Sequence, residues 1–304
     1  MVVAARISGV ILAVAACTTS PVVTSPGPSH GLDASAGPSV DAGVAIPRIL
    51  ILSTDGTLSI YDPQQPAPQL PRRLIVPPGR WNLTSGPASV ALTSLDPAGS
   101  RTILLGTIPD AAFVGDEQIT LPAGDPWQGG YAACLSGAGP ILAADAGLAL
   151  WLIAPGEAPV KLPNQGNNTG GCAWLDDSRV VWEQENDRLA TFDLEAAKTS
   201  ELPATDIVGD PSGGRGRIAG RTAQDGLDVR AYTLDGSSVK IGPSVGRIDP
   251  EVGGSLSADG RWLVTAGPDP LARVYRVDET SLTAFGSFGI GADDRVEWMP
   301  LPGP

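Results

Sequence analysis

Residues 172–203 read CAWLDDSRVVWEQENDRLATFDLEAAKTSELP, and residues 253–285 read GGSLSADGRWLVTAGPDPLARVYRVDETSLTAF. Each stretch contains an apolar run, a tight turn and a second apolar run. Asp-Ser or Asp-Gly between apolar runs favours a hairpin, because the centre of the turn requires positive φ. The stretches align at Trp174–Arg179 and Leu256–Arg261, which predicts two copies of one β-structured unit.

Weaker copies of this unit occur elsewhere in the chain. A third runs from Asp210 to Gly236, and others begin near Leu95 and Cys134. Each copy has one residue that we expect to precede its first turn: Leu95, Cys134, Trp174, Asp210, Leu256 and Trp298. These positions are 36 to 46 residues apart. Four short strands and their turns occupy about 40 residues, the length of one propeller blade.

The two ends of this region are predicted to complete one blade together. Residues 48–62, RILILSTDGTLSIYD, begin with what should be a second strand. Residues 293–304, DDRVEWMPLPGP, supply a first strand, with Trp298 at the position of Trp174. Pairing the ends would remove the strand edges that an open array leaves exposed. We therefore predict an all-β, six-bladed β-propeller over residues 47–304, with four antiparallel strands per blade; seven blades would require a further copy.

The repeat resembles the TolB-type six-bladed propeller family, whose blades carry a Trp-Ser-Pro-Asp-Gly turn. The turn is degenerate here: WLDDS at 174–178, LSADG at 256–260 and WMPLPG at 298–303. The resemblance covers about residues 48–304. It implies architecture and not function, because quinoprotein and tryptophan–aspartate-repeat propellers look similar at this level.

The first residues of the chain are predicted to direct export. An apolar run from Ile7 to Ala16 follows Arg6 and is too short to span a bilayer. It ends in Val14-Ala15-Ala16-Cys17, which resembles the bacterial lipobox, with Val in place of the usual Leu. The resemblance implies that residues 1–16 are a lipoprotein signal peptide and that lipidated Cys17 anchors the chain at the extracytoplasmic face of the cell membrane. An ordinary cleaved signal peptide is the alternative.

Residues 17–46 are predicted to be a disordered tether, because small residues and Pro dominate and no apolar periodicity is present. The domains are therefore expected to be a signal peptide at 1–16, a lipidated tether at 17–46 and a propeller at 47–304.

Composition restricts the chemistry of the chain. Acidic residues outnumber basic ones by 13, which disfavours nucleic acid as a partner. The single histidine, His30, lies in the tether, so residues 47–304 offer no imidazole for a catalytic triad or a histidine metal site. The Gly27–Gly31 match to a nucleophile elbow lacks the strand and helix that such an elbow requires. No catalytic residue is predicted, and whether the chain is an enzyme stays open.

Two cysteines, Cys134 and Cys172, fall on predicted innermost strands of adjacent blades. In the blade alignment they are offset by two residues, which places both side chains on the same strand face. They could form a disulfide outside the cytoplasm, unless the Cα separation between the strands is too long. Two buried thiols, or a functional thiol, are the alternatives.

The connections between blades are predicted to gather polar and aromatic side chains on one rim around the central channel. Functional residues concentrate on loops that a rigid scaffold positions. The predicted rim residues are Arg80, Trp81, Asn82, Asp125, Trp127, Asn164, Asn167, Asn168, Asp206, Arg247, Asp249, Glu251, Asp293 and Asp294. Their carboxylates and amides could hold Ca²⁺, or could be solvated loop groups. The tryptophans within strand patterns, Trp174, Trp182, Trp262 and Trp298, are expected to pack in the core.

These features favour a monomeric, lipid-anchored propeller that binds an envelope protein or a cell-wall component without catalysis. One alternative is a calcium-dependent hydrolase similar to the propeller lactonases. The other is a small-ligand sensor that serves a transport or signalling system.

Overall fold

The computed structural model describes fifteen ranges of the chain. These are residues 45–65, 71–79, 81–95, 100–121, 133–137, 139–144, 149–162, 168–184, 188–202, 207–222, 226–233, 237–245, 254–266, 270–291 and 294–300. All of them belong to the compact unit Val40–Pro304. Every regular element within these ranges is a β-strand. No helix in this part of the chain is long and apolar enough to cross a membrane.

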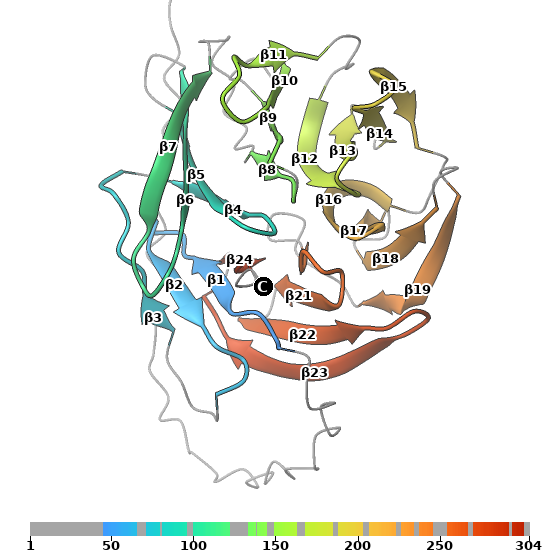
Figure 1. The fold of residues 1–304 in the computed structure, drawn as a ribbon. Helices are drawn as coiled ribbons and strands as arrows, with labels where there is room; N and C mark the ends of the chain where they lie inside the picture. The colour runs from blue at the N-terminus through green and yellow to red at the C-terminus, as the bar shows by residue number, and fades with distance from the viewer. Residues whose placement is uncertain are drawn as a thin grey trace, which may run out of the picture. The chain divides into compact units, whose positions relative to one another are not determined.

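The strands of the described ranges form six antiparallel sheets of four strands each, which stand around a central axis as the blades of a propeller (Figure 1). Blade 1 combines β24 (Arg295–Trp298) with β1 (Ile49–Leu52), β2 (Leu58–Tyr61) and β3 (Arg72–Arg73). Blade 2 contains β4 (Asn82–Ser85), β5 (Val90–Leu95), β6 (Arg101–Thr107) and β7 (Val114–Leu121). Blade 3 contains β8 (Cys134–Leu135), β9 (Ile141–Ala144), β10 (Leu150–Ile153) and β11 (Val160–Lys161).

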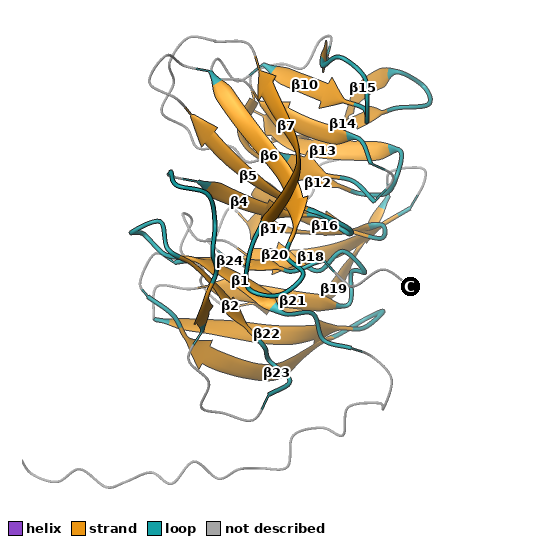
Figure 2. Cartoon of the chain, turned by 60° about the vertical axis from the view of Figure 1, so that its left-hand side comes forward, coloured by secondary structure: helices purple, strands orange, loops and turns teal. Residues whose placement is uncertain are grey.

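The remaining blades follow in chain order. Blade 4 contains β12 (Asn168–Trp174), β13 (Arg179–Gln184), β14 (Arg188–Asp193) and β15 (Lys198–Glu201). Blade 5 contains β16 (Ile207–Gly214), β17 (Arg217–Thr222), β18 (Leu227–Tyr232) and β19 (Ser238–Val245). Blade 6 contains β20 (Gly254–Leu256), β21 (Trp262–Ala266), β22 (Leu271–Val277) and β23 (Leu282–Gly289). Figure 2 shows the blades from the side. The predicted six-bladed, all-β architecture is confirmed.

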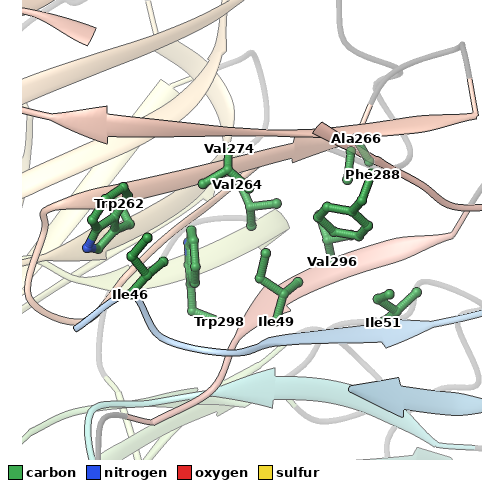
Figure 3. Close-up of a cluster of buried hydrophobic side chains, with 11 residues drawn as sticks. Ile46, Ile49, Ile51, Trp262, Val264, Ala266, Val274, Phe288, Val296 and Trp298 are labelled. Atoms are coloured by element: carbon green, nitrogen blue, oxygen red, sulfur yellow. The ribbon is translucent and has the colours of Figure 1, made fainter. Parts of the chain in front are cut away.

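The predicted closure of the ring is also confirmed. Strand β24 pairs antiparallel with β1, so that Trp298 lies opposite Ile49 and Arg295 opposite Leu52. The side chains of Val296 and Trp298 pack with Ile49 and with Trp262 of blade 6 in one buried cluster (Figure 3). Strand β24, the last described strand, therefore pairs with β1, the first, and packs against blade 6.

The tryptophans of the strand patterns are buried, as expected. Trp174, Trp182, Trp262 and Trp298 are each at most 6% exposed. Two of them bridge blades in the same way. The indole N–H of Trp174 donates to the carbonyl oxygen of Cys134 at 2.9 Å, and the indole N–H of Trp298 donates to that of Ser255 at 2.8 Å. In both cases the tryptophan that ends an innermost strand reaches the innermost strand of the preceding blade.

The repeat alignment was wrong in blade 2. Leu95 ends β5, the second strand of its blade, whereas the first strand, β4, ends at Ser85. The first turn is closed by a hydrogen bond from the amide of Gly86 to the carbonyl oxygen of Ser89. The stretch LDPAGSRTILLGT has the composition of the first hairpin but forms the second one, since the same turn residues serve either position.

The alignment was also wrong in blade 5, where residues 210–215 were expected to form a turn. Strand β16 continues to Gly214, and the turn lies at Arg215 and Gly216, with φ of 46° and 75°. The register of β16 shifts on both sides of Gly209, and a bulge can accommodate a proline that has no N–H to donate. A Cβ atom on Gly214 would lie 2.4 Å from the carbonyl oxygen of Ser257 in the next blade. Residues 210–214 thus have the composition of a turn but form part of a bulged strand that lies close to the next blade.

Candidate functional site

A cavity of about 760 Å³ lies where the six innermost strands meet. Residues of β4, β8, β12, β16, β20 and β24 all line it, together with residues that follow each of these strands. Each blade contributes one strand to the wall, so ring closure creates the cavity. Concave sites of this size, built from several elements of a rigid scaffold, are typical of ligand binding.

The wall of the cavity combines apolar and charged groups. Trp174, Trp298, Leu135, Leu256 and Met299 supply apolar surface. The charged residues of the wall are Asp176, Asp177, Arg215, Asp259 and Glu297. Four of these five groups are acidic; Asp176 is paired with Arg179, which leaves Asp177, Asp259 and Glu297 against Arg215 and a smaller excess of negative charge.

Two of the acidic groups organise the turns at the edge of the cavity. Asp176 accepts hydrogen bonds from the amides of Ser178 and Arg179, and its other oxygen pairs with the Arg179 guanidinium at 2.6 Å. Burial by itself would raise the pKa of Asp176, but the bonds from Arg179 and Ser178 lower the pKa below its usual value. Asp259 accepts a bond from the Ser257 hydroxyl at 2.6 Å and one from the amide of Arg261. Each of these two carboxylates therefore stabilises the turn in which it lies.

Glu297 differs from the turn carboxylates because it lies within an innermost strand. It is half-buried in β24 between the buried Val296 and Trp298. One carboxylate oxygen accepts a hydrogen bond of 2.6 Å from the hydroxyl of Ser255, a buried residue of β20. Burial raises the pKa of Glu297 to about 7, although the Ser255 bond and the charge of Arg295 act in the opposite direction.

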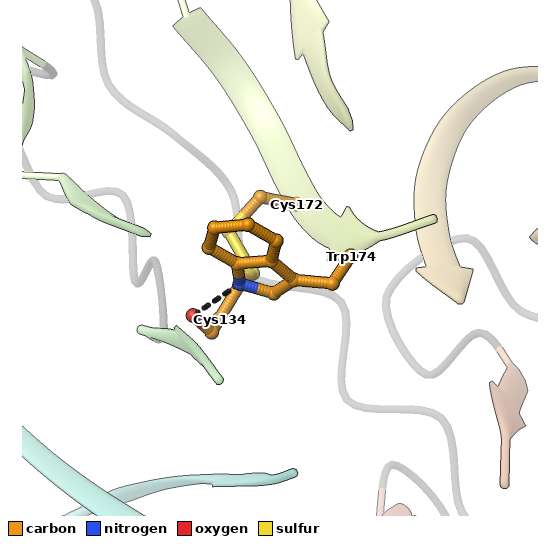
Figure 4. Close-up of a disulfide and its surroundings, with 3 residues drawn as sticks. All are labelled: Cys134, Cys172 and Trp174. Carbon is orange, nitrogen blue, oxygen red and sulfur yellow. Dashed lines mark hydrogen bonds between the residues drawn. A yellow bond between two sulfur atoms is a disulfide. The ribbon is translucent and has the colours of Figure 1, made fainter. Parts of the chain in front are cut away.

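A disulfide joins Cys134 of β8 to Cys172 of β12 and forms part of the cavity wall. The Cα atoms are 5.9 Å apart, so neighbouring innermost strands are close enough for a bridge. The indole of Trp174 packs in the same buried cluster as both cysteines and donates its N–H to the Cys134 carbonyl (Figure 4). The structure therefore contains the disulfide, and not the two thiols that were its alternatives.

Three of the predicted rim residues have described side chains, and two of them, Trp81 and Asp294, are engaged in contacts within the fold. The indole N–H of Trp81 donates to the carbonyl oxygen of Pro77 at 3.0 Å, and the ring packs against the core of blades 1 and 2. Asn82 begins β4, opposite Thr93. Asp294 is 6% exposed and accepts a hydrogen bond from the amide of Gly291 at 2.8 Å. None of the three lines the axial cavity.

The other rim residues lie outside the part that can be described. Asn168 belongs to β12, but only its backbone is described. Ten positions fall in the undescribed segments: Arg80, Asp125, Trp127, Asn164, Asn167, Asp206, Arg247, Asp249, Glu251 and Asp293. Cys17 and His30 fall there as well. Among the described residues, no three His, Cys, Asp or Glu side chains are arranged to hold a metal ion. Calcium at the predicted rim stays a prediction.

The comparisons with known proteins assign no family. No protein-family model matches the chain, and no curated protein matches it. A solved structure from Bacteroides uniformis, described as a candidate 6-phosphogluconolactonase, aligns with 79% of this chain and 80% of its own. The TM-score is 0.49 and the identity 14%. A similarity this distant does not indicate what the present chain does. The blade architecture is shown by the strand pairing of the chain itself.

Sequence reasoning missed the residues of the axial cavity. The rim prediction relied on the long connections between blades, whereas the cavity is lined by strand residues and by the short first turns. The available signal was in residues 295–298, Arg-Val-Glu-Trp, where charged and apolar side chains alternate along a predicted first strand and Glu297 directly precedes the bridging tryptophan.

Proposed function

We propose that this chain is a monomeric, lipid-anchored β-propeller on the extracytoplasmic face of the cell membrane, where it binds an envelope protein or a cell-wall component. The bound group enters the axial cavity. The observation that carries the proposal is the cavity itself, about 760 Å³ with one wall segment from every blade. Because all six blades must be in place to form it, the whole ring serves one site.

A binding role without catalysis fits the groups that line the cavity. Asp176 and Asp259 are engaged by their own turns, and residues 47–304 contain no histidine to act as a general base. Asp177 and Arg215 are exposed where they line the cavity and can contact an incoming partner. Tryptophan and arginine are the side chains most often found at the energetic centre of protein interfaces.

The anchor and tether give the proposed role a location. Two acyl chains on Cys17 would hold the chain to a bilayer, where a single chain would not. A tether of 30 residues, 17–46, has a random-coil reach of about 30 Å, which lets the propeller reach partners near the membrane surface. The chain as a whole has a net charge of −13, which opposes contact with anionic lipid head groups.

Site-specific photocrosslinking in intact envelopes tests the proposal. A photoreactive residue at position 177 lines the cavity, and one at Glu195 lies in an exposed turn outside it. We expect a discrete adduct from position 177 that is absent from position 195 and is lost when Ala258→Trp obstructs the cavity. The matched control Ala196→Trp should leave the adduct intact. The same membranes test the anchor, since Cys17→Ser should release the chain into the soluble fraction. Equal adducts from both positions, or no adduct from either, would overturn the proposal that the cavity is the binding site.

A small-ligand sensor is a second candidate, favoured by the cavity volume. Sites for small molecules typically measure about 300–1,000 Å³, and this cavity lies in that range. In that case Ala258→Trp should abolish the thermal shift given by extracted envelope metabolites, with no protein adduct at position 177.

A further inference from the structure

The carboxylate of Glu297 identifies the chemical class of the bound group. This inference rests on the proposed function, because it concerns the same cavity. We infer that the cavity binds an organic cation, an ammonium or guanidinium group, and that the Glu297 carboxylate pairs with it. The cation belongs either to a small amine or to a lysine or arginine side chain of a partner.

The hydrogen bonds of Glu297 leave its carboxylate incompletely satisfied. A carboxylate offers about four acceptor positions, and Glu297 fills one of them with the hydroxyl of Ser255 at 2.6 Å. No lysine or arginine of the described residues forms an ion pair with it. Arg295, two residues earlier in the same strand, is exposed and acts on Glu297 only through its charge.

The position of Glu297 makes this carboxylate available to a ligand. The side chain lines the axial cavity, and its neighbours in β24 are buried. Glu297 itself is half-buried, and its carboxylate loses part of the solvation that a partner of opposite charge can replace. A cation in the cavity would supply that replacement. The raised pKa of Glu297 is consistent with a carboxylate that lacks a counter-charge in the unliganded protein.

The rest of the wall favours the same class of ligand. Asp177 and Asp259 add negative charge to the cavity, whereas the charge of Asp176 is paired with Arg179, and Arg215 is the one basic residue among the described residues that line it. An excess of one sign raises the local concentration of the opposite ion. Leu135, Leu256 and Met299 offer apolar surface for the carbon chain that carries the cationic group.

Titration calorimetry of the full chain in detergent tests the inference. The probes are n-butylamine and spermidine, with n-butanol as the neutral control. A second arm uses a short peptide with one central lysine and the same peptide with that lysine acetylated. Tight binding of the free amines indicates a small-molecule source, whereas selective binding of the lysine peptide indicates a partner side chain. Either result supports the shared chemistry.

Matched variants locate the binding to Glu297. Glu297→Gln keeps the shape and can still accept the Ser255 bond, but it removes the charge. We expect it to weaken amine binding at least about tenfold, the effect of losing one charged hydrogen bond. Glu195→Gln makes the same charge change in an exposed turn outside the cavity and should leave binding unchanged.

The pH dependence supplies a separate test. Ser255 from β20 and the charge of Arg295 act on Glu297, and Thr84 and Ser85 of β4 line the same cavity. The other charged groups of the wall are Asp176, Asp177, Asp259 and Arg215. Amine affinity should fall about tenfold per pH unit below pH 7, and Glu297→Gln should remove that slope.

Two outcomes would overturn the inference: equal binding of n-butanol and n-butylamine, or equal binding of n-butylamine to the wild type and to Glu297→Gln. A crosslink from position 177 that persists in that case would leave the proposed function standing. If that crosslink also failed, the proposed function would fail with it.

Discussion

Glu297 shows how the ionisation of a single carboxyl group can reduce stability. Its pKa is raised from 4.5 to about 7 in the folded chain, so the folded state holds this proton more tightly than the unfolded state. Between these pH values unfolding releases a proton, and the free energy of unfolding falls as pH rises. The loss is complete above about pH 7 and amounts to up to about 3 kcal/mol.

Glu297→Gln should therefore stabilise the chain above pH 7, by about 1–3 kcal/mol. Urea unfolding at a series of pH values between about 4 and 9 measures this. The variant should lose the decline between about pH 4.5 and 7 that the wild type shows, and Glu195→Gln should retain it. A variant less stable than the wild type at high pH would show that the carboxylate is structural.

At the scale of one element, the disulfide compensates for a very short strand. Strand β8 has two residues, which pair only with Leu142 and Ile141 of β9. The innermost strands of the other blades have three to eight residues. The bridge from Cys134 to Cys172 links β8 to the longer β12 of the next blade, and both cysteines line the cavity.

Removal of the bridge by Cys134→Ser and Cys172→Ser should lower the free energy of unfolding by about 2–4 kcal/mol, because the unfolded chain loses a crosslink. Hydrogen exchange should accelerate first at the amides of β8 and β9. Reductant should reproduce both effects in the wild type and add nothing in the double variant. Unchanged exchange in β8 would show that the strand is held by packing alone.

The outermost strand of blade 6, β23, shows how the fold limits pairing at an exposed strand edge. A long edge strand exposes unpaired N–H and C=O groups, which invites pairing with another chain. Strand β23, LTAFGSFG, has no charged residue to prevent this. Its register against β22 shifts between Val274 and Tyr275, which leaves Phe285 as an extra residue. The ring of Phe285 packs edge-on against Trp262 at 5.4 Å, so the bulge both disrupts the edge and adds to the core.

For the whole molecule, the sequence predicted the architecture better than the site. Blade number and closure followed from a repeat of about 40 residues and from the position of Trp298, because each blade must bury the same faces. The register within β16 could not be predicted, since Asp210-Pro211-Ser212-Gly213-Gly214 has the composition of a turn. The cavity could not be predicted either. Its wall combines six strands, and an error of one residue in any register sends the side chain to the other face.

The ring as a whole should depend on strand β24. Deletion of residues 295–304 removes the partner of β1 and takes Val296 and Trp298, both at most 3% exposed, out of their cluster with Trp262. Loss of a buried tryptophan alone costs about 3–5 kcal/mol, and a typical domain has only about 5–15 kcal/mol in total. We therefore expect the truncated chain to lose its cooperative denaturant transition and to aggregate through the exposed edge of β1.

A circular permutant separates this effect from that of moving a chain end. Residue 304 is linked to residue 47, and new ends are placed between Leu202 and Ile207, the connection from β15 to β16. This chain keeps every strand pairing, including Trp298 with Ile49. It should unfold cooperatively near the wild-type denaturant midpoint, as measured by tryptophan fluorescence, because the pairing closes the ring wherever the ends lie. If the truncated chain unfolded at the same midpoint, inter-blade packing would suffice, and β24 would be only a passive cover for β1.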